Sequence, residues 1–241
     1  MSREIFQSRK IKIHFKNGDG STGVVHCKNL VVAAGTVQTP YLLCKSNIIS
    51  WKSTQFQWHP MIRVIAESGQ ADLGLNDVDP FQAWTGDRDY KFGSAVSTPG
   101  LLAMNLGRIL NQEEMSKLRS VYVSFISSGR GGLIPGTKIP WYLPSDTDKL
   151  RRINAARLVK EMVVAGGANL LSPINGRNIS TSTVHIFGSL PINSGLFETG
   201  TSRLKIDSRI QVSDGSLLPF GPGVNPQGTI MALCKALVVE K

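Results

Sequence analysis

The feature that most constrains the fold is a short, uninterrupted apolar run at residues 30–35, Leu-Val-Val-Ala-Ala-Gly. A strand covered on both faces of a parallel sheet is typically continuous in this way, whereas a half-exposed strand alternates apolar and polar residues. Residues 36–44 then resemble the beginning of a helix, with Pro40 expected at the first helical position. The order of strand, turn and helix predicts an α/β unit in the first fifty or so residues.

An alternating segment precedes this run. Apolar residues at positions 11, 13 and 15 are separated by Lys12, His14 and Lys16, and the turn sequence Asn-Gly-Asp-Gly follows at residues 17–20. This pattern predicts a β-hairpin, because these turn residues tolerate the positive φ that a tight turn needs. A hairpin this early has no sheet before it to join, so we expect further sequence upstream.

The middle of the chain predicts an antiparallel region. Short alternating segments at residues 53–144 are divided by Gly, Pro, Asn and Asp, and the expected strands are 61–67, 101–106 and 121–126. Residues 145–165 predict a helix capped by Ser145 or Thr147 and ended by two glycines. A strand at 206–214 and a helix at 229–239 are expected to close the chain.

Composition excludes several classes of protein. No apolar run approaches the roughly 18 residues of a membrane span, and the charged N-terminus lacks the apolar stretch of a secretory signal, so a cytoplasmic protein without a membrane span is expected. The net charge is +10, but the basic residues are scattered without interleaved aromatics, and no nucleic-acid partner is expected. Cys27, Cys44 and Cys234 lack metal-ligand spacing; we interpret them as buried thiols and expect no metal site.

Three stretches carry candidate chemistry. The first is residues 31–43, in which Ala and Gly let a cofactor approach the backbone just before a helix begins. The second is Val-His-Ile-Phe-Gly-Ser at residues 184–189, although a lone histidine is more often structural. The third joins Val-Ser-Asp-Gly-Ser-Leu-Leu-Pro at 212–219 to Gly-Val-Asn-Pro-Gln-Gly-Thr-Ile at 223–230. There Asn225 and Pro226 would open a helix whose free N–H groups can meet an anion.

In this order and spacing, the three stretches resemble the glucose-methanol-choline (GMC) oxidoreductase family, which binds FAD and oxidises alcohols. The resemblance implies that His185 accepts the hydroxyl proton of the alcohol while a hydride moves to the flavin. Asn225 would orient the alcohol oxygen, since an amide cannot take up the proton. His59 resembles a family position at the junction of the substrate domain, but the extended geometry of a His-Pro dipeptide is sufficient to explain it as structural. The implied FAD-binding residues are Ala34, Gly35, Asp214, Gly215, Asn225, Pro226 and Thr229. Taken alone, Asp214 could equally be an ordinary turn residue.

The implied fold is of the α/β plus α+β class. A partial, Rossmann-like FAD-binding region would be built from both chain ends, residues 1–50 and 186–241. Residues 51–185 would form an inserted substrate domain, with an antiparallel sheet that carries helices on one side.

The Gly-x-Gly-x-x-Gly fingerprint that holds the FAD phosphates does not occur in the sequence. We therefore expect the C-terminal part of an FAD-dependent enzyme that oxidises the CH–OH group of an alcohol, polyol or sugar. Such a chain would be either truncated or completed by a separate N-terminal half. One alternative is a non-catalytic remnant or accessory subunit that binds a partner chain through a sheet edge. Another is a basic, β-rich binding domain in which the motifs are accidental.

Overall fold

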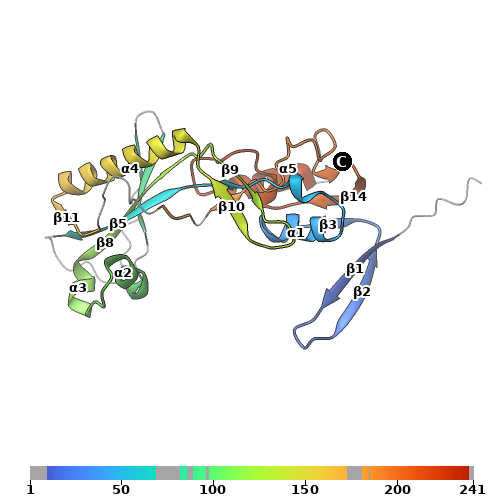
Figure 1. Ribbon diagram of the computed structural model, residues 1–241, viewed down its shortest axis with the longest axis horizontal. Coiled ribbons are helices and arrows are strands. Elements are labelled where there is room, and N and C mark those ends of the chain that lie inside the picture. Colours follow the sequence, from blue (N-terminus) through green and yellow to red (C-terminus); the bar gives the residue numbers. More distant parts are fainter. Residues whose placement is uncertain are drawn as a thin grey trace, which may run out of the picture.

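The computed structural model describes residues 10–68, 82–85, 89–95, 98–172, 181–183 and 185–238. The molecule is elongated, with a five-stranded sheet towards one end and a three-stranded sheet towards the other (Figure 1). None of the helices in these ranges is long and apolar enough to cross a membrane.

The five-stranded sheet is antiparallel throughout, in the order β11-β5-β8-β7-β6. Its central pair is β5 (Met61–Ser68) and β8 (Leu118–Phe125), in register from Met61 opposite Ser124 to Glu67 opposite Leu118. The outer strands are β11 (Ala168–Leu170), β7 (Tyr90–Ala95) and β6 (Gln82–Trp84). The predicted strands at 61–67 and 121–126 and the antiparallel arrangement are thus confirmed.

Helices cover both faces of this sheet. Because successive strand residues point to opposite faces, Ile62, Val64 and Ala66 form one core with α4 (Asp146–Ala165), and Ile65 packs on the other side. There Ile65 meets Leu102 of α2 (Pro99–Leu106), next to α3 (Gln112–Lys117). The expectation that the helices lie on one side only is therefore wrong.

The expectation of a strand at residues 101–106 is also wrong, because these residues belong to α2. Pro99 occupies the first turn, where its missing N–H is not needed, and Gly107 ends the helix with a φ of 68°. These two end signals outweigh the apolar character that suggested a strand.

Both chain ends contribute to the three-stranded sheet, whose order is β13-β14-β3. β3 (Leu30–Val32) runs parallel to β14 (Asp207–Val212), and β14 forms an antiparallel hairpin with β13 (Arg203–Leu204). Val32 and Val212 point into a core that also contains Leu204. Val31 points to the other face and is 50% exposed, so the expected burial of this strand on both faces is wrong for the described part of the chain.

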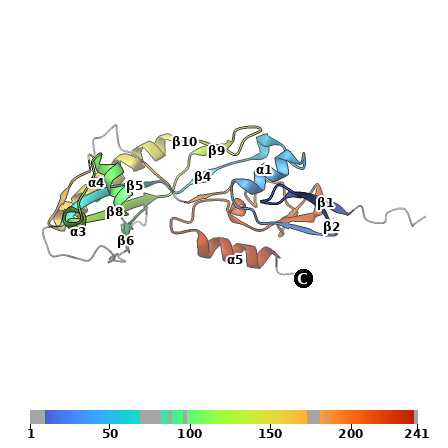
Figure 2. The ribbon, with the colours of Figure 1, turned by 90° about the horizontal axis from the view of Figure 1, so that it is seen from below.

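Two helices flank this sheet. Figure 2 shows α1 (Gln38–Lys45) and α5 (Gln227–Val238) on opposite sides of this end of the molecule. Pro40 is the third residue of α1 rather than the first. The predicted hairpin is confirmed as β1 (Ile11–Lys16) and β2 (Thr22–Cys27), which projects away from the body (Figure 1).

The chain leaves the region of the three-stranded sheet and returns to it at the same place. β4 (Gln57–Trp58) leads towards β5, and β12 (Ile186–Phe187) leads back, and the two strands pair antiparallel. An inserted region whose ends lie close together has this arrangement. A second hairpin of β9 (Arg130–Leu133) and β10 (Pro140–Leu143), with short 3-10 turns at Trp51–Ser53 and Gly215–Leu217, completes the described elements. The boundaries proposed at residues 50 and 186 stay a prediction.

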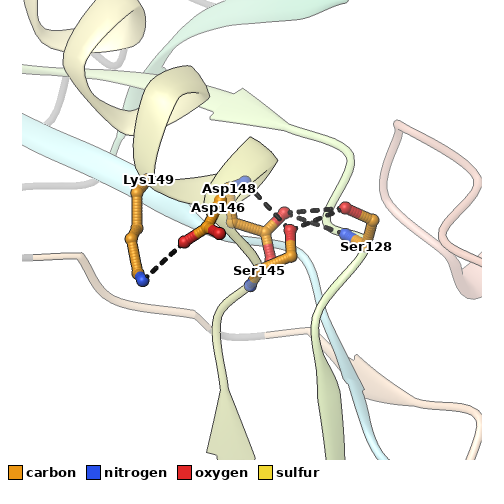
Figure 3. A network of polar contacts seen from close by, with 5 residues as sticks. All are labelled: Ser128, Ser145, Asp146, Asp148 and Lys149. Atoms are coloured by element: carbon orange, nitrogen blue, oxygen red, sulfur yellow. Dashed lines mark hydrogen bonds and ion pairs between the residues drawn. The ribbon is translucent and has the colours of Figure 1, made fainter.

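The first turn of α4 is fixed by a network of polar contacts around Asp148 (Figure 3). The Ser145 hydroxyl accepts a hydrogen bond from the Asp148 N–H, and the Asp148 carboxylate accepts from the Ser145 N–H, which forms a capping box. The same carboxylate accepts from the Ser128 N–H and from the Tyr142 hydroxyl. Burial raises the pKa of Asp148, but these hydrogen bonds outweigh it and hold the pKa below its usual value. The expected Ser145 cap is confirmed.

Replacing Asp148 by alanine is expected to lower the free energy of unfolding by about 2 kcal/mol, because several donors would lose a buried, charged acceptor. Urea denaturation measures the change. Asp146→Ala is the matched control, since that side chain lies in the same helical turn but is 94% exposed. A loss no larger than that of the control would show that the network contributes nothing to stability.

Candidate active site

Two histidines meet where the chain crosses between the sheets. The Nδ1 atoms of His59 and His185 lie 3.2 Å apart, and the ring planes are inclined by 22° with their centroids 5.5 Å apart, so the rings meet edge to edge. The backbone holds them there, because the His59 N–H donates to the His185 carbonyl. The Thr183 hydroxyl can donate to the carbonyl oxygen of either histidine, at 3.0 Å from each. From the sequence, His59 was interpreted as structural. In the structure its ring lies within hydrogen-bond distance of the ring of His185, the predicted catalytic base.

The environment of the pair favours neutral imidazoles. His59 is 3% exposed, and burial lowers its pKa to about 4, with smaller contributions from the positive charges of His185 and Lys91. Burial, and then the charge of Lys91, also lower the pKa of His185. Lys91 itself lies buried on β7, and its own pKa is lowered by burial. At neutral pH His185 can therefore accept a proton.

The depressed pKa of His59 predicts a loss of stability in mild acid. The unfolded chain takes up a proton on this residue below about pH 6.5, while the folded chain does so only near pH 4, so stability falls as pH falls through this window. Between pH 7.5 and pH 5, His59 is expected to contribute about 2 kcal/mol to that fall. Urea denaturation at the two pH values, compared between the native chain and His59→Gln, measures it.

The exposed His14 of the β1–β2 hairpin supplies the control for this experiment. A His14→Gln variant should keep the acid sensitivity of the native chain. Equal acid sensitivity of the native chain and His59→Gln would show that His59 titrates normally and that the pair is not buried as described.

Asp214 joins the two turns that the sequence assigned to cofactor binding. One oxygen of its carboxylate accepts hydrogen bonds from the Gly35 N–H at 2.9 Å and from the Thr39 hydroxyl at 2.5 Å. The other oxygen accepts from the Ser216 N–H at 2.8 Å. The side chain therefore holds the turn after β3 against the turn after β14. A contact of the Asp214 backbone with FAD stays a prediction.

The two glycines of these turns serve different purposes. A Cβ on Gly215 would come within 2.9 Å of the Thr36 hydroxyl oxygen and 3.1 Å of Ile230, so only glycine fits without a shift. Gly35 has a φ of 89°, and no described atom would lie within 4 Å of a Cβ there. Ala34 beside it is exposed. The Ala34–Gly35 backbone thus borders open space, which is what a flat cofactor needs to approach it closely.

Asn225 lies at the beginning of α5. Its side-chain oxygen accepts a hydrogen bond from the Gln227 N–H at 3.2 Å, as expected of a capping residue. The helix begins two residues earlier than predicted. Asn225 and Thr229 are exposed and Pro226 is buried, so the first turn of α5 lies partly at the surface.

The loop that leads to Asn225 passes close to the strand that follows His185. A Cβ on Gly221 would lie 3.1 Å from the Phe187 ring, which places this loop against β12. In the described part of the chain, however, His185 is joined to His59 and not to Asn225. Val184, the first residue of the histidine motif, lies outside the described residues. No group of three His, Cys, Asp or Glu side chains within the described ranges is placed to hold a metal ion.

We compared the chain with known proteins. No family model matches the chain. A curated relative, an uncharacterised GMC-type oxidoreductase of Sinorhizobium fredii, is 26% identical over an alignment that covers 84% of this chain and 47% of the relative. The similarity to GMC-type oxidoreductases is thereby confirmed, at their C-terminal part.

Solved structures of GMC enzymes have the same fold. Pyridoxine 4-oxidase from Mesorbium loti superposes with a TM-score of 0.65 at 15% identity, over 93% of this chain and 53% of the oxidase. Formate oxidase superposes with a TM-score of 0.68 at 11% identity, over 93% of this chain and 56% of the oxidase. FAD modification has been studied in a formate oxidase from Aspergillus oryzae that matches with a TM-score of 0.65. The chain spans about half the length of the GMC relatives it matches.

Proposed function

We propose that this chain is the active-site-bearing, C-terminal part of an FAD-dependent oxidoreductase that oxidises the CH–OH group of an alcohol, polyol or sugar. The observation that carries the proposal is the contact of two histidine rings at the crossing between the sheets, where burial lowers the pKa of both. A base that is uncharged at neutral pH suits the removal of a hydroxyl proton. The similarity to GMC-type oxidoreductases supports both the reaction class and the cofactor.

Several described residues fit one end of an FAD molecule. The open backbone at Ala34 and Gly35 and the neighbouring turn at Asp214 and Gly215 would contact the ring system. The beginning of the twelve-residue α5, near the exposed Thr229, is a positive helix end suited to negative charge on the cofactor. When bound, FAD supplies the acceptor for the hydride.

A separate or upstream N-terminal half would hold the phosphates of the cofactor. β3 lies at the edge of its sheet among the described strands, and Val31 is half exposed there. An unpaired edge can add a further strand, and a covering segment would bury Val31. Both features favour a partner segment at this end of the molecule.

The roles of the two site residues follow from their hydrogen-bonding capacity. The neutral His185 would accept the hydroxyl proton of the alcohol at its Nε2 atom. Asn225 already uses its side-chain oxygen to cap α5, so its NH2 group is the part that can donate to the alcohol oxygen. Proton uptake and orientation of the oxygen thus fall to different side chains.

Flavin reduction by a panel of substrates tests the proposal. The chain, completed with an N-terminal half and loaded with FAD, is mixed without oxygen with primary alcohols, polyols and sugars, and flavin bleaching is followed. We expect reduction by at least one class of CH–OH donor. A correctly folded, FAD-loaded enzyme that none of these donors reduces would contradict the proposal.

Asn225→Asp separates the two functions of Asn225, because a carboxylate still caps the helix but cannot donate to an alcohol oxygen. We expect flavin reduction to slow by roughly tenfold or more, with the melting temperature little changed. Asn225→Ser is the complementary variant, since it also keeps a capping side chain and shortens the donor. Native rates in both variants would remove Asn225 from the site.

A further inference from the structure

The proposed mechanism leaves His59 without a role, although its ring lies within hydrogen-bond distance of the ring of His185. We infer that His59 is a positioning residue that accepts the Nδ1–H of His185 and so fixes His185 in the tautomer whose Nε2 is bare. The inference rests on the proposed function for the use made of that bare nitrogen. The tautomer itself is a property of this chain.

The distance between the two Nδ1 atoms permits one proton, and only one, between them. At 3.2 Å an N–H on one ring can donate to a bare nitrogen on the other. Two N–H groups facing each other at this distance would repel, and two bare nitrogens would form no bond. Each protonation state of His185 therefore dictates what His59 must carry at Nδ1.

The protonated state of His185 decides between the two arrangements. Once His185 has taken up the hydroxyl proton at Nε2, both of its nitrogens carry protons, so the facing Nδ1 of His59 must be bare. His59 can stay neutral in that state, because it is more deeply buried than His185 and has Lys91 close by. A resting state with the same arrangement needs no proton exchange between the rings when substrate reacts.

The surrounding contacts hold this arrangement in place. The His59 N–H is bonded to the His185 carbonyl, and Pro60 follows directly, so the backbone of His59 has little freedom. Thr183 lies within hydrogen-bond distance of both carbonyls. The Nε2 atom of His59 is buried and has no partner among the described residues, so it offers no route by which His59 could pass a proton on. His59 is thus suited to orient His185 and not to relay protons.

Nitrogen NMR of the chain labelled with 15N-histidine tests the inference directly, because the two neutral tautomers and the imidazolium have different nitrogen shifts. His14 and His26 are exposed on the β1–β2 hairpin and serve as internal references. At neutral pH we expect His185 to carry its proton predominantly on Nδ1, and His59 predominantly on Nε2. A His185 protonated mainly on Nε2 would overturn the inference.

Two variants separate positioning from simple packing. His59→Phe keeps a ring but removes the acceptor, and His59→Asn places an amide near the former Nδ1. We expect the Nδ1–H tautomer of His185 to be lost in the first variant and restored in the second, with flavin reduction in the completed enzyme slowed roughly tenfold by Phe and less by Asn. Equal tautomer populations in the native chain and both variants would overturn the inference.

The NMR experiment tests the role of His59, and the flavin assay tests the proposed function, so the two hypotheses can be contradicted independently. If His185 carries the Nδ1 proton in the native chain but no alcohol reduces the flavin, the proposed function is wrong and the role of His59 in setting the tautomer stands. If alcohols reduce the flavin but His185 carries its proton on Nε2, the inference about His59 is wrong and the enzyme class stands.

Discussion

Flavin reduction in the completed, FAD-loaded enzyme is expected to slow by roughly 100-fold or more when His185 is replaced by alanine. The reason is the position of this side chain, which is only partly exposed, lies beside a second neutral imidazole, and has a pKa lowered by burial and by Lys91. Among the described residues, the proposed site contains no other side chain assigned to accept the hydroxyl proton. Anaerobic stopped-flow spectroscopy of flavin bleaching measures the rate.

Two comparisons make this prediction specific. His14→Ala removes an exposed histidine of the hairpin, and in this variant substrate should reduce the flavin at the native rate. The flavin content of His185→Ala should equal that of the native enzyme, since the proposed cofactor contacts come from other turns. Unchanged reduction kinetics with full flavin content would remove His185 from the mechanism.

Replacing Asp214 by alanine is expected to lower the free energy of unfolding by about 3 kcal/mol, the largest stability effect predicted for this chain. The carboxylate is 8% exposed and accepts hydrogen bonds from the Gly35 N–H, the Thr39 hydroxyl and the Ser216 N–H. Alanine would leave all three donors without this acceptor and would free the turn after β3 from the turn after β14. Urea denaturation followed by circular dichroism measures the loss.

A second aspartate near the other end of the same strand provides the control. Asp207 lies at the beginning of β14 and forms an ion pair with Arg209 near the surface, so Asp207→Ala should cost less than about 1 kcal/mol. If the two aspartate variants lose equal stability, the link between the turns is not what holds this part of the fold together. Flavin affinity should also fall in Asp214→Ala, because the turns it joins are the proposed cofactor contacts.

Elements with local signals could be predicted from the sequence. The Asn-Gly-Asp-Gly turn determined the β1–β2 hairpin, and the Ser145 capping box determined the beginning of α4. The apolar run at residues 30–35 correctly indicated a parallel strand, whose partner β14 comes from the other end of the chain. The residues that fix the hairpin and the beginning of α4 are neighbours in sequence.

Features that depend on distant residues could not be predicted in this way. His59 and His185 are 126 positions apart, and a single His-Pro dipeptide carries no sign of the second ring. The Asp-Gly-Ser turn likewise gave no indication that the Asp214 carboxylate reaches Gly35 and Thr39. The helix α2 was missed because six apolar-rich residues fit either a short strand or a short helix, and only Pro99 and Gly107 at its ends distinguish the two.

Retention of FAD is the measurement that tests the central claim most directly. The purified 241-residue chain is incubated with FAD, alone and with an N-terminal half that carries a Gly-x-Gly-x-x-Gly unit, and visible flavin absorbance is measured after gel filtration. We expect flavin to stay with the protein only when the N-terminal half is present. Folded protein that retains no flavin under either condition would contradict this expectation, and would favour a non-catalytic subunit that binds a partner chain.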